Sequence, residues 1–221
     1  MKGLLIKDFH LMKMQKNYFL LILMISLAFI FSSKGNQGAL SYAIGFFCIT
    51  GTLFAMSTVS YDEFDNGNPF LFSLPFTRKT YVLEKYCFGL IVGTGFWLLC
   101  TLLSVFFLVF NKLPFTGERV GSFLLLVPLF LVLLSVMLPF TLKYGGEKSR
   151  LMIIGFVGGI LLLGFLLNSA IRLLNLDLSG FLSFLSTLDY RVLLAGILAA
   201  ACLILLCSLK LSISIVRKKE F

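Results

Sequence analysis

The chain has 221 residues, of which 59% are hydrophobic and only 13% are charged, and its mean hydropathy is +1.00. These values exclude an ordinary soluble globular domain. The net charge of +9 comes from lysines and arginines in several short segments, without the basic stripe or aromatic platform of a nucleic-acid-binding protein. The sequence therefore predicts an integral membrane protein that binds no nucleic acid.

Residues 1–17 form a basic and moderately amphipathic leader. Apolar side chains such as Leu4 and Phe9 lie roughly on one side of a helix, Lys2 and Lys13 lie on the other, and Asp8 interrupts the apolar side. We expect an N-terminal cytoplasmic helix that runs on into the first span. It either lies in the membrane interface or acts only as a topogenic signal.

Six apolar segments are candidates for crossing the hydrocarbon, which takes roughly 20 residues of helix. Helices are expected because every backbone polar group must be satisfied within the protein, and the segments lack the alternating polarity of barrel strands. The sequence predicts a single all-α membrane domain over residues 1–221. The expected spans are Tyr18–Ser33, Ala39–Ser60, Phe88–Phe110, Gly121–Leu142, Leu151–Ile171 and Val192–Val216.

Residues 172–190, between the last two spans, are rich in Leu and Phe but are interrupted by Asp177 and Gly180. They are too short to cross, so we expect an external re-entrant hairpin or an apolar loop on the outer surface. Positive charge is concentrated before the first span, in residues 61–86, after the fourth span and at the C-terminus. By the positive-inside rule, both termini and the 61–86 loop are cytoplasmic.

Small residues recur at the spacing that lets membrane helices approach closely. The helix-packing candidates are Gly89 and Gly93 in the third span and Gly155 and Gly159 in the fifth. The five cysteines show no CxxC pairing and His10 has no partner, so we expect no metal site. No charged residue lies near the middle of a span, which argues against an ion-driven carrier and favours an amphipathic or hydrophobic cargo.

The loop at residues 61–86 holds most of the polar chemistry of the chain. Thr77 is expected to cap a helix that runs into the third span. The apolar block at residues 70–74 would be costly to leave in water, which indicates a docking surface. The chain has no GxxxxGK[ST] phosphate loop and no nucleophile–base pair, so we expect no catalytic site of its own.

The pattern Tyr61-Asp62-Glu63, then Ser73-Leu74-Pro75, Arg78, Tyr81 and Lys85-Tyr86 resembles the ABC-2 type transporter permeases. It is closest to the small six-span branch that includes phenol-soluble modulin exporter permeases. This resemblance implies a multi-pass protein of the bacterial plasma membrane that exports its cargo by alternating access. The family moves several classes of cargo, and the nearest branch together with the uncharged interior favours an amphipathic or hydrophobic cargo, with a peptide preferred.

The same resemblance implies an assembly of two permeases, as a homodimer or heterodimer in membrane lipid, and two ABC ATPase subunits. ATP and Mg would bind to the ATPase, and this chain would hold no cofactor. The loop would insert a coupling helix into the ATPase through Tyr61, Asp62, Glu63, Phe70, Leu74, Pro75, Arg78 and Lys79. An alternative hypothesis is an ATP-independent membrane sensor or immunity protein that binds a peptide or a signalling partner.

Overall fold

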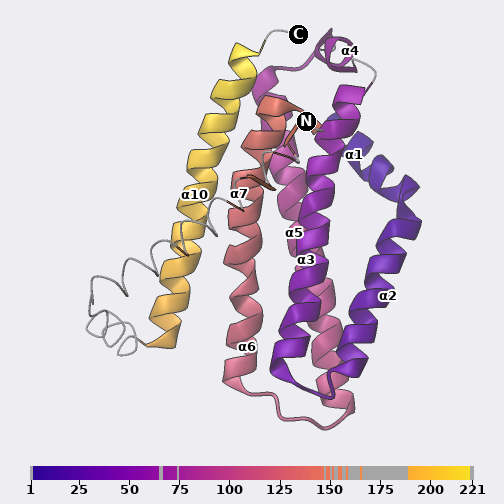
Figure 1. Ribbon diagram of the computed structural model, residues 1–221, viewed down its shortest axis with the longest axis vertical. Coiled ribbons are helices and arrows are strands. Elements are labelled where there is room, and N and C mark those ends of the chain that lie inside the picture. Colours follow the sequence, from indigo (N-terminus) through magenta and orange to yellow (C-terminus); the bar gives the residue numbers. More distant parts are fainter. Residues whose placement is uncertain are drawn as a thin grey trace.

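A computed structural model of the chain describes residues 2–64, 67–73, 75–146, 148–149, 151, 154–155, 158, 165 and 189–219. In this part of the chain every regular element is a helix (Figure 1). The helices are α1 (Lys2–Met14), α2 (Lys16–Ser32), α3 (Gln37–Glu63), α4 (Gly67–Ser73), α5 (Arg78–Phe110), α6 (Gly117–Leu124), α7 (Leu126–Tyr144) and α10 (Tyr190–Lys218).

Four helical stretches of the described chain are long and apolar enough to cross a membrane: α3, α5, α6 with α7, and α10. A fifth candidate arises if α1 and α2, which meet at a bend of 66°, form one span. These stretches contain five of the six predicted spans. The predicted span Leu151–Ile171 and the predicted hairpin at residues 172–190 lie almost entirely outside the described residues.

The N-terminal helix was expected to run on into the first span, and the structure adds a sharp bend between them, because α1 ends at Met14 and α2 leaves it at an angle of 66°. The inner side of α1 explains this direction. Leu4 and Asp8 are buried there, and α1 contacts α5. The apolar side of α1 therefore packs on the protein itself.

Local sequence accounts for several helix ends. The Asn36 side chain accepts a hydrogen bond from Gly38 N and begins α3, and the Asp189 side chain accepts one from Arg191 N and begins α10. The predicted cap at Thr77 is confirmed, since its Oγ1 accepts from Thr80 N at 3.2 Å. Helix α7 ends at Gly145, whose φ of +81° favours glycine.

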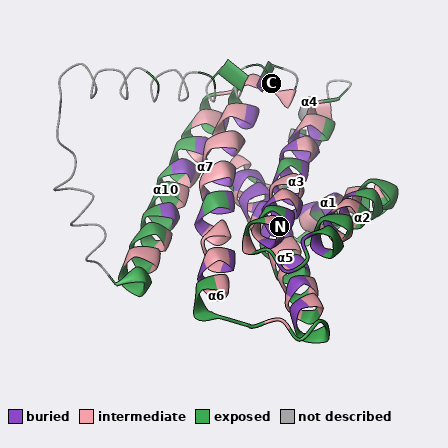
Figure 2. Ribbon diagram, turned by 60° about the horizontal axis from the view of Figure 1, so that its bottom comes forward, coloured by how far each residue is buried: buried purple, intermediate pink, exposed green. Residues whose placement is uncertain are grey.

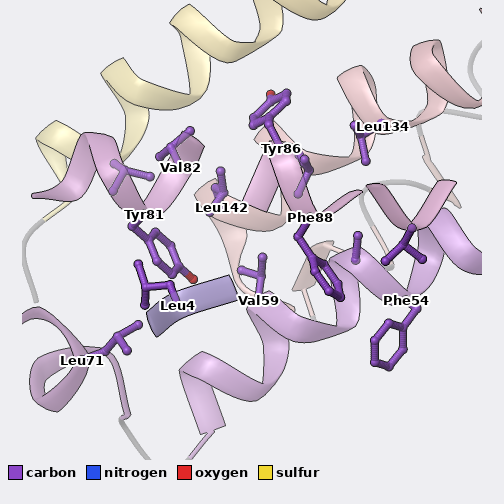
Figure 3. Close-up of a cluster of buried hydrophobic side chains, with 14 residues drawn as sticks. Leu4, Phe54, Val59, Leu71, Tyr81, Val82, Tyr86, Phe88, Leu134 and Leu142 are labelled. Carbon is purple, nitrogen blue, oxygen red and sulfur yellow. The ribbon is translucent and has the colours of Figure 1, made fainter. Parts of the chain in front are cut away.

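Helix α3 contacts α2, α5 and α7, and α10 packs on α7 and α5. Many outward-facing side chains of these helices are apolar and exposed (Figure 2), as expected for surfaces that face lipid. The largest buried cluster lies at one end of the bundle and ties six helices together (Figure 3). Its members include Leu4 of α1, Val59 of α3, Leu71 of α4, Tyr81 of α5, Leu142 of α7 and Val216 of α10.

That end of the bundle also holds α1, α4 and the C-terminal end of α10 (Figure 1). Helices α7 and α10 run in the same direction. Tyr190, at the start of α10, lies against Gly121 of α6, whereas Lys219 reaches the carbonyl of Leu142 at the other end. The chain segments that the sequence predicts to be cytoplasmic are therefore gathered at one end.

Candidate functional site

A buried group of charges lies where α1, α3 and α5 meet. We call it the charge cluster and define it as Lys7, Asp8, Asp62, Glu84 and Lys85. Lys85 is fully buried, and its Nζ lies 2.5 Å from Asp8 Oδ2 and 2.8 Å from Asp62 Oδ2. Lys7 pairs with Asp62 and lies 3.4 Å from Asp8 Oδ1. Opposite charges from three helices thus pair with one another in a largely buried site.

The hydrogen bonds of Lys85 are complete. An ammonium group has three donors, and Lys85 directs them at Asp8, Asp62 and Thr58 Oγ1, the last at 3.1 Å. Tyr81 adds a hydrogen bond to Asp62 Oδ2 at 3.1 Å. Because a buried charge is tolerated only when it is paired and hydrogen-bonded, this geometry holds α1 and α3 in fixed positions against α5.

Local structure explains why these side chains meet. Thr77 fixes the start of α5, so that Tyr81, Lys85 and Phe88 share one helix face at spacings of four and three residues. Asp8 is the acidic residue inside the apolar face of the N-terminal helix, and Lys85 is what it pairs with. Sequence analysis noted the interruption at Asp8 but missed its partner.

A second polar group at the same end holds the C-terminal end of α10. Glu63 Oε1 lies 2.9 Å from Lys219 Nζ, and Glu63 Oε2 accepts from Gly146 N at 2.9 Å. Arg78 donates to the backbone carbonyls of residues 216, 217 and 219. These are the carbonyls that a helix end leaves without partners, so Arg78 caps α10 from α5.

Helix α4 crosses this end of the bundle between α3 and α5 (Figure 1). Leu71 points inward, is only 8% exposed and joins the buried cluster of Figure 3. Part of the apolar block thus packs on the protein itself. The side chain of Phe70 and all of Leu74 lie outside the described residues.

A comparison with known families matches residues 3–217 of this chain to the ABC-2 family transporter proteins. The chain belongs to that family. An ABC-2 permease is the membrane part of a transporter whose ATPase is an ABC subunit, so the match supports such a partner for this multi-pass membrane protein. No match was found among curated proteins or among solved structures.

The residues predicted to couple this ABC-2 permease to an ATPase fall into two groups. Asp62, Glu63 and Arg78 have partners within the chain, as described above. Tyr61 is 48% exposed although its hydroxyl accepts from Gln15, and Pro75 and Lys79 are exposed. Phe64, which sequence analysis did not single out, is 72% exposed beside them. The ATPase contact itself stays a prediction.

The predicted packing glycines also differ from one another. A Cβ added to Gly89 or Gly93 would lie 2.4 or 3.0 Å from side chains of α7, so these positions of α5 allow a close approach. Gly155 has open space around it, and Gly159 lies outside the described residues.

A polar chain inside the bundle links α5, α10 and α7. Tyr86 Oη lies 2.6 Å from Ser208 Oγ and 2.8 Å from Ser212 Oγ. Ser208 donates in turn to the carbonyl of Ser135. Pro139, four residues later in α7, has no N–H for that carbonyl, so Ser208 replaces the missing helical hydrogen bond. Nothing in the sequence of α7 indicates that a hydroxyl from α10 would satisfy this carbonyl.

A cavity of about 500 Å³ opens between α2, α3 and α7 near the same end. Its lining mixes polar side chains with apolar ones: Gln15, Ser57 and Thr141 beside Tyr18, Leu53 and Met137. Such a lining suits a molecule with both polar and apolar parts.

Proposed function

We propose that this chain is the permease subunit of an ATP-driven exporter in the bacterial plasma membrane, with no catalytic site of its own. A separate ABC ATPase binds ATP and Mg and drives alternating access of the permease. The family match over residues 3–217 is the observation that carries this proposal. The full assembly contains two permeases, alike or different, and two ATPases.

The cytoplasmic side is the end that holds α1, α4 and the C-terminal end of α10. The distribution of positive charge supports this orientation. Exposed basic residues at that end include Lys2, Lys13, Lys79, Lys143 and Lys148, and basic residues concentrate on cytoplasmic loops. Both chain termini are then cytoplasmic. The parallel directions of α7 and α10 agree with an odd number of crossings between them, as the six-span arrangement requires.

The ATPase contacts the exposed part of this end, namely Tyr61, Phe64, Pro75 and Lys79 together with α4. Asp62, Glu63 and Arg78 act differently. Their charges are used within the chain, so they position the loop and do not themselves bind the partner. Aromatic residues such as Phe64 are enriched at the centres of protein interfaces.

The cargo is an amphipathic molecule, and a peptide is the class that the sequence favours. The mixed lining of the 500 Å³ cavity supports this class. The cavity opens near the cytoplasmic end, where an exported molecule would enter. None of the described residues that line the cavity is charged, so an ion is a poor candidate.

The test is to extract the chain from its native membrane in mild detergent and to identify bound proteins by mass spectrometry. We expect a soluble subunit that carries a phosphate loop, in equal amount. Phe64→Asp should remove it because a charge would enter the proposed interface. The matched control is Phe115→Asp, since Phe115 is 53% exposed in the loop at the opposite end, and it should retain the ATPase.

Recovery of the chain alone, in preparations that keep it folded, would overturn the permease assignment and favour the sensor or immunity hypothesis. Loss of the ATPase from both variants would refute the location of the interface. ATP hydrolysis by the complex, stimulated by candidate peptides, then tests the cargo class.

A further inference from the structure

Among the members of the charge cluster, Glu84 takes no part in the ion pairs described above. It is fully buried. Among the described residues, neither of its carboxylate oxygens has a hydrogen-bond partner. The nearest cation, Lys85 Nζ, lies 3.9 Å from Glu84 Oε2 and directs its hydrogen bonds at other groups. An ionised carboxylate in that position would cost several kcal/mol.

The Asp8 carboxylate also has an oxygen without a hydrogen bond among the described residues. Its Oδ2 accepts from Lys85, but its Oδ1 has no hydrogen bond in the described structure, although Lys7 Nζ lies 3.4 Å away. The Glu84 carboxyl lies beside this carboxylate and interacts with it. Two buried carboxyl groups, each with at least one oxygen that has no hydrogen bond in the described structure, thus interact across the α1–α5 contact.

The net charge of the cluster also indicates that one proton is missing from the groups described above. Asp8, Asp62 and Glu84 supply three carboxylates, whereas Lys7 and Lys85 supply two ammonium groups. One added proton makes the cluster neutral. It also supplies the donor that Glu84 and Asp8 lack, because a protonated carboxyl has one O–H.

We infer that the charge cluster is a binding site for one proton, carried by Glu84 and donated to Asp8 Oδ1, and that this proton holds α1 against α5. When the proton leaves, two carboxylates face one another in a buried site and repel. Loss of the proton therefore weakens the docking of α1.

The charged groups that act on Glu84 are Lys85 of its own helix and Asp8 and Lys7 of α1. Asp62 of α3 lies on the other side of Lys85 and is bonded by Tyr81. Helices α4, α7 and α10 contribute apolar side chains to the surrounding core, namely Leu71, Leu142 and Val216.

Infrared difference spectroscopy of the purified full chain tests the proton directly. A protonated carboxyl has its own carbonyl band, which shifts between light and heavy water. We expect this band at neutral pH in the wild type and in the control Glu118→Gln, which changes an exposed glutamate at the far end. It should be lost in Glu84→Gln. Absence of the band from the wild type, or its persistence in Glu84→Gln, would overturn the inference.

A melting experiment separates a proton site from a merely structural glutamate. Gln keeps an N–H donor for Asp8 and carries no charge, so Glu84→Gln should melt within about 3 °C of the wild type at neutral pH. An unfolded glutamate has released its proton by about pH 5, whereas the folded site still holds it, so the wild type should lose stability relative to Glu84→Gln as the pH rises from about 5 to neutral. The difference should then level off at higher pH, because the folded state has lost the proton as well. Equal changes of Tm between about pH 5 and neutral in the two proteins, or a fall of more than about 6 °C in Glu84→Gln at neutral pH, would refute the site.

Discussion

Lys85→Met provides a quantitative test of the charge cluster. The substitution keeps an unbranched side chain but removes the ammonium group that bonds Asp8, Asp62 and Thr58. Breaking a buried ion pair by removing one partner costs roughly 3–5 kcal/mol. Asp62 would keep Lys7 and Tyr81, so the loss falls mainly on Asp8, and we expect the lower end, about 3 kcal/mol.

For a chain of this length, 1 kcal/mol shifts Tm by about 2–4 °C, so Lys85→Met should melt about 6–12 °C below the wild type. The assay is the fluorescence of Trp97, the one tryptophan in the chain, whose indole N–H bonds the carbonyl of Phe123. The matched control is Lys79→Met in the first turn of the same helix, where the side chain is exposed. It should melt within about 2 °C of the wild type.

A second variant shows whether the loss arises from the unpaired charge. Asp8→Asn combined with Lys85→Met removes both charges and keeps an acceptor for Glu84, so it should recover more than half of the lost stability. The ion-pair explanation fails if Lys85→Met melts with the wild type, or if the double variant is as unstable as the single one.

Two further predictions concern the packing of α5. Gly89→Ala should destabilise the chain by about 1–3 kcal/mol, because the new Cβ would lie 2.4 Å from a buried side chain of α7. Gly95→Ala on the same helix has open space and should gain up to about 1 kcal/mol; thermal melts with the same sign for both variants would contradict the packing argument. Tyr86→Phe should cost about 1–2 kcal/mol through its bonds to two serines, as measured by melting against the exposed control Tyr42→Phe. An unchanged Tm in Tyr86→Phe would show that the polar chain adds no stability.

Much of the fold could be predicted from the sequence because a membrane imposes a length and a polarity on every helix that crosses it. Four of the predicted spans lie within α3, α5, α6 with α7, and α10. The cap at Thr77 followed from local chemistry alone. The direction of α1 was not predictable in this way, because it depends on a buried contact with α5.

Only part of the site could be predicted from the sequence. The 61–86 loop was identified correctly as the place where polar groups gather, yet the roles within it were divided by contacts with distant segments. Glu63 meets Lys219, and Arg78 meets the end of α10, both more than 130 residues away along the chain. No pattern within the loop contains that information.

The sequence by itself determined that this protein lies in a membrane, where its long apolar segments lie and where its positive charge is concentrated. Those properties depend on summed hydropathy and charge, which can be read from local stretches. The tertiary structure decided that Asp8, Asp62, Glu84 and Lys85 share one buried site and which loop residues remain exposed. Those properties depend on which helix faces meet, and in helices that are apolar on nearly every side the sequence does not distinguish one face from another.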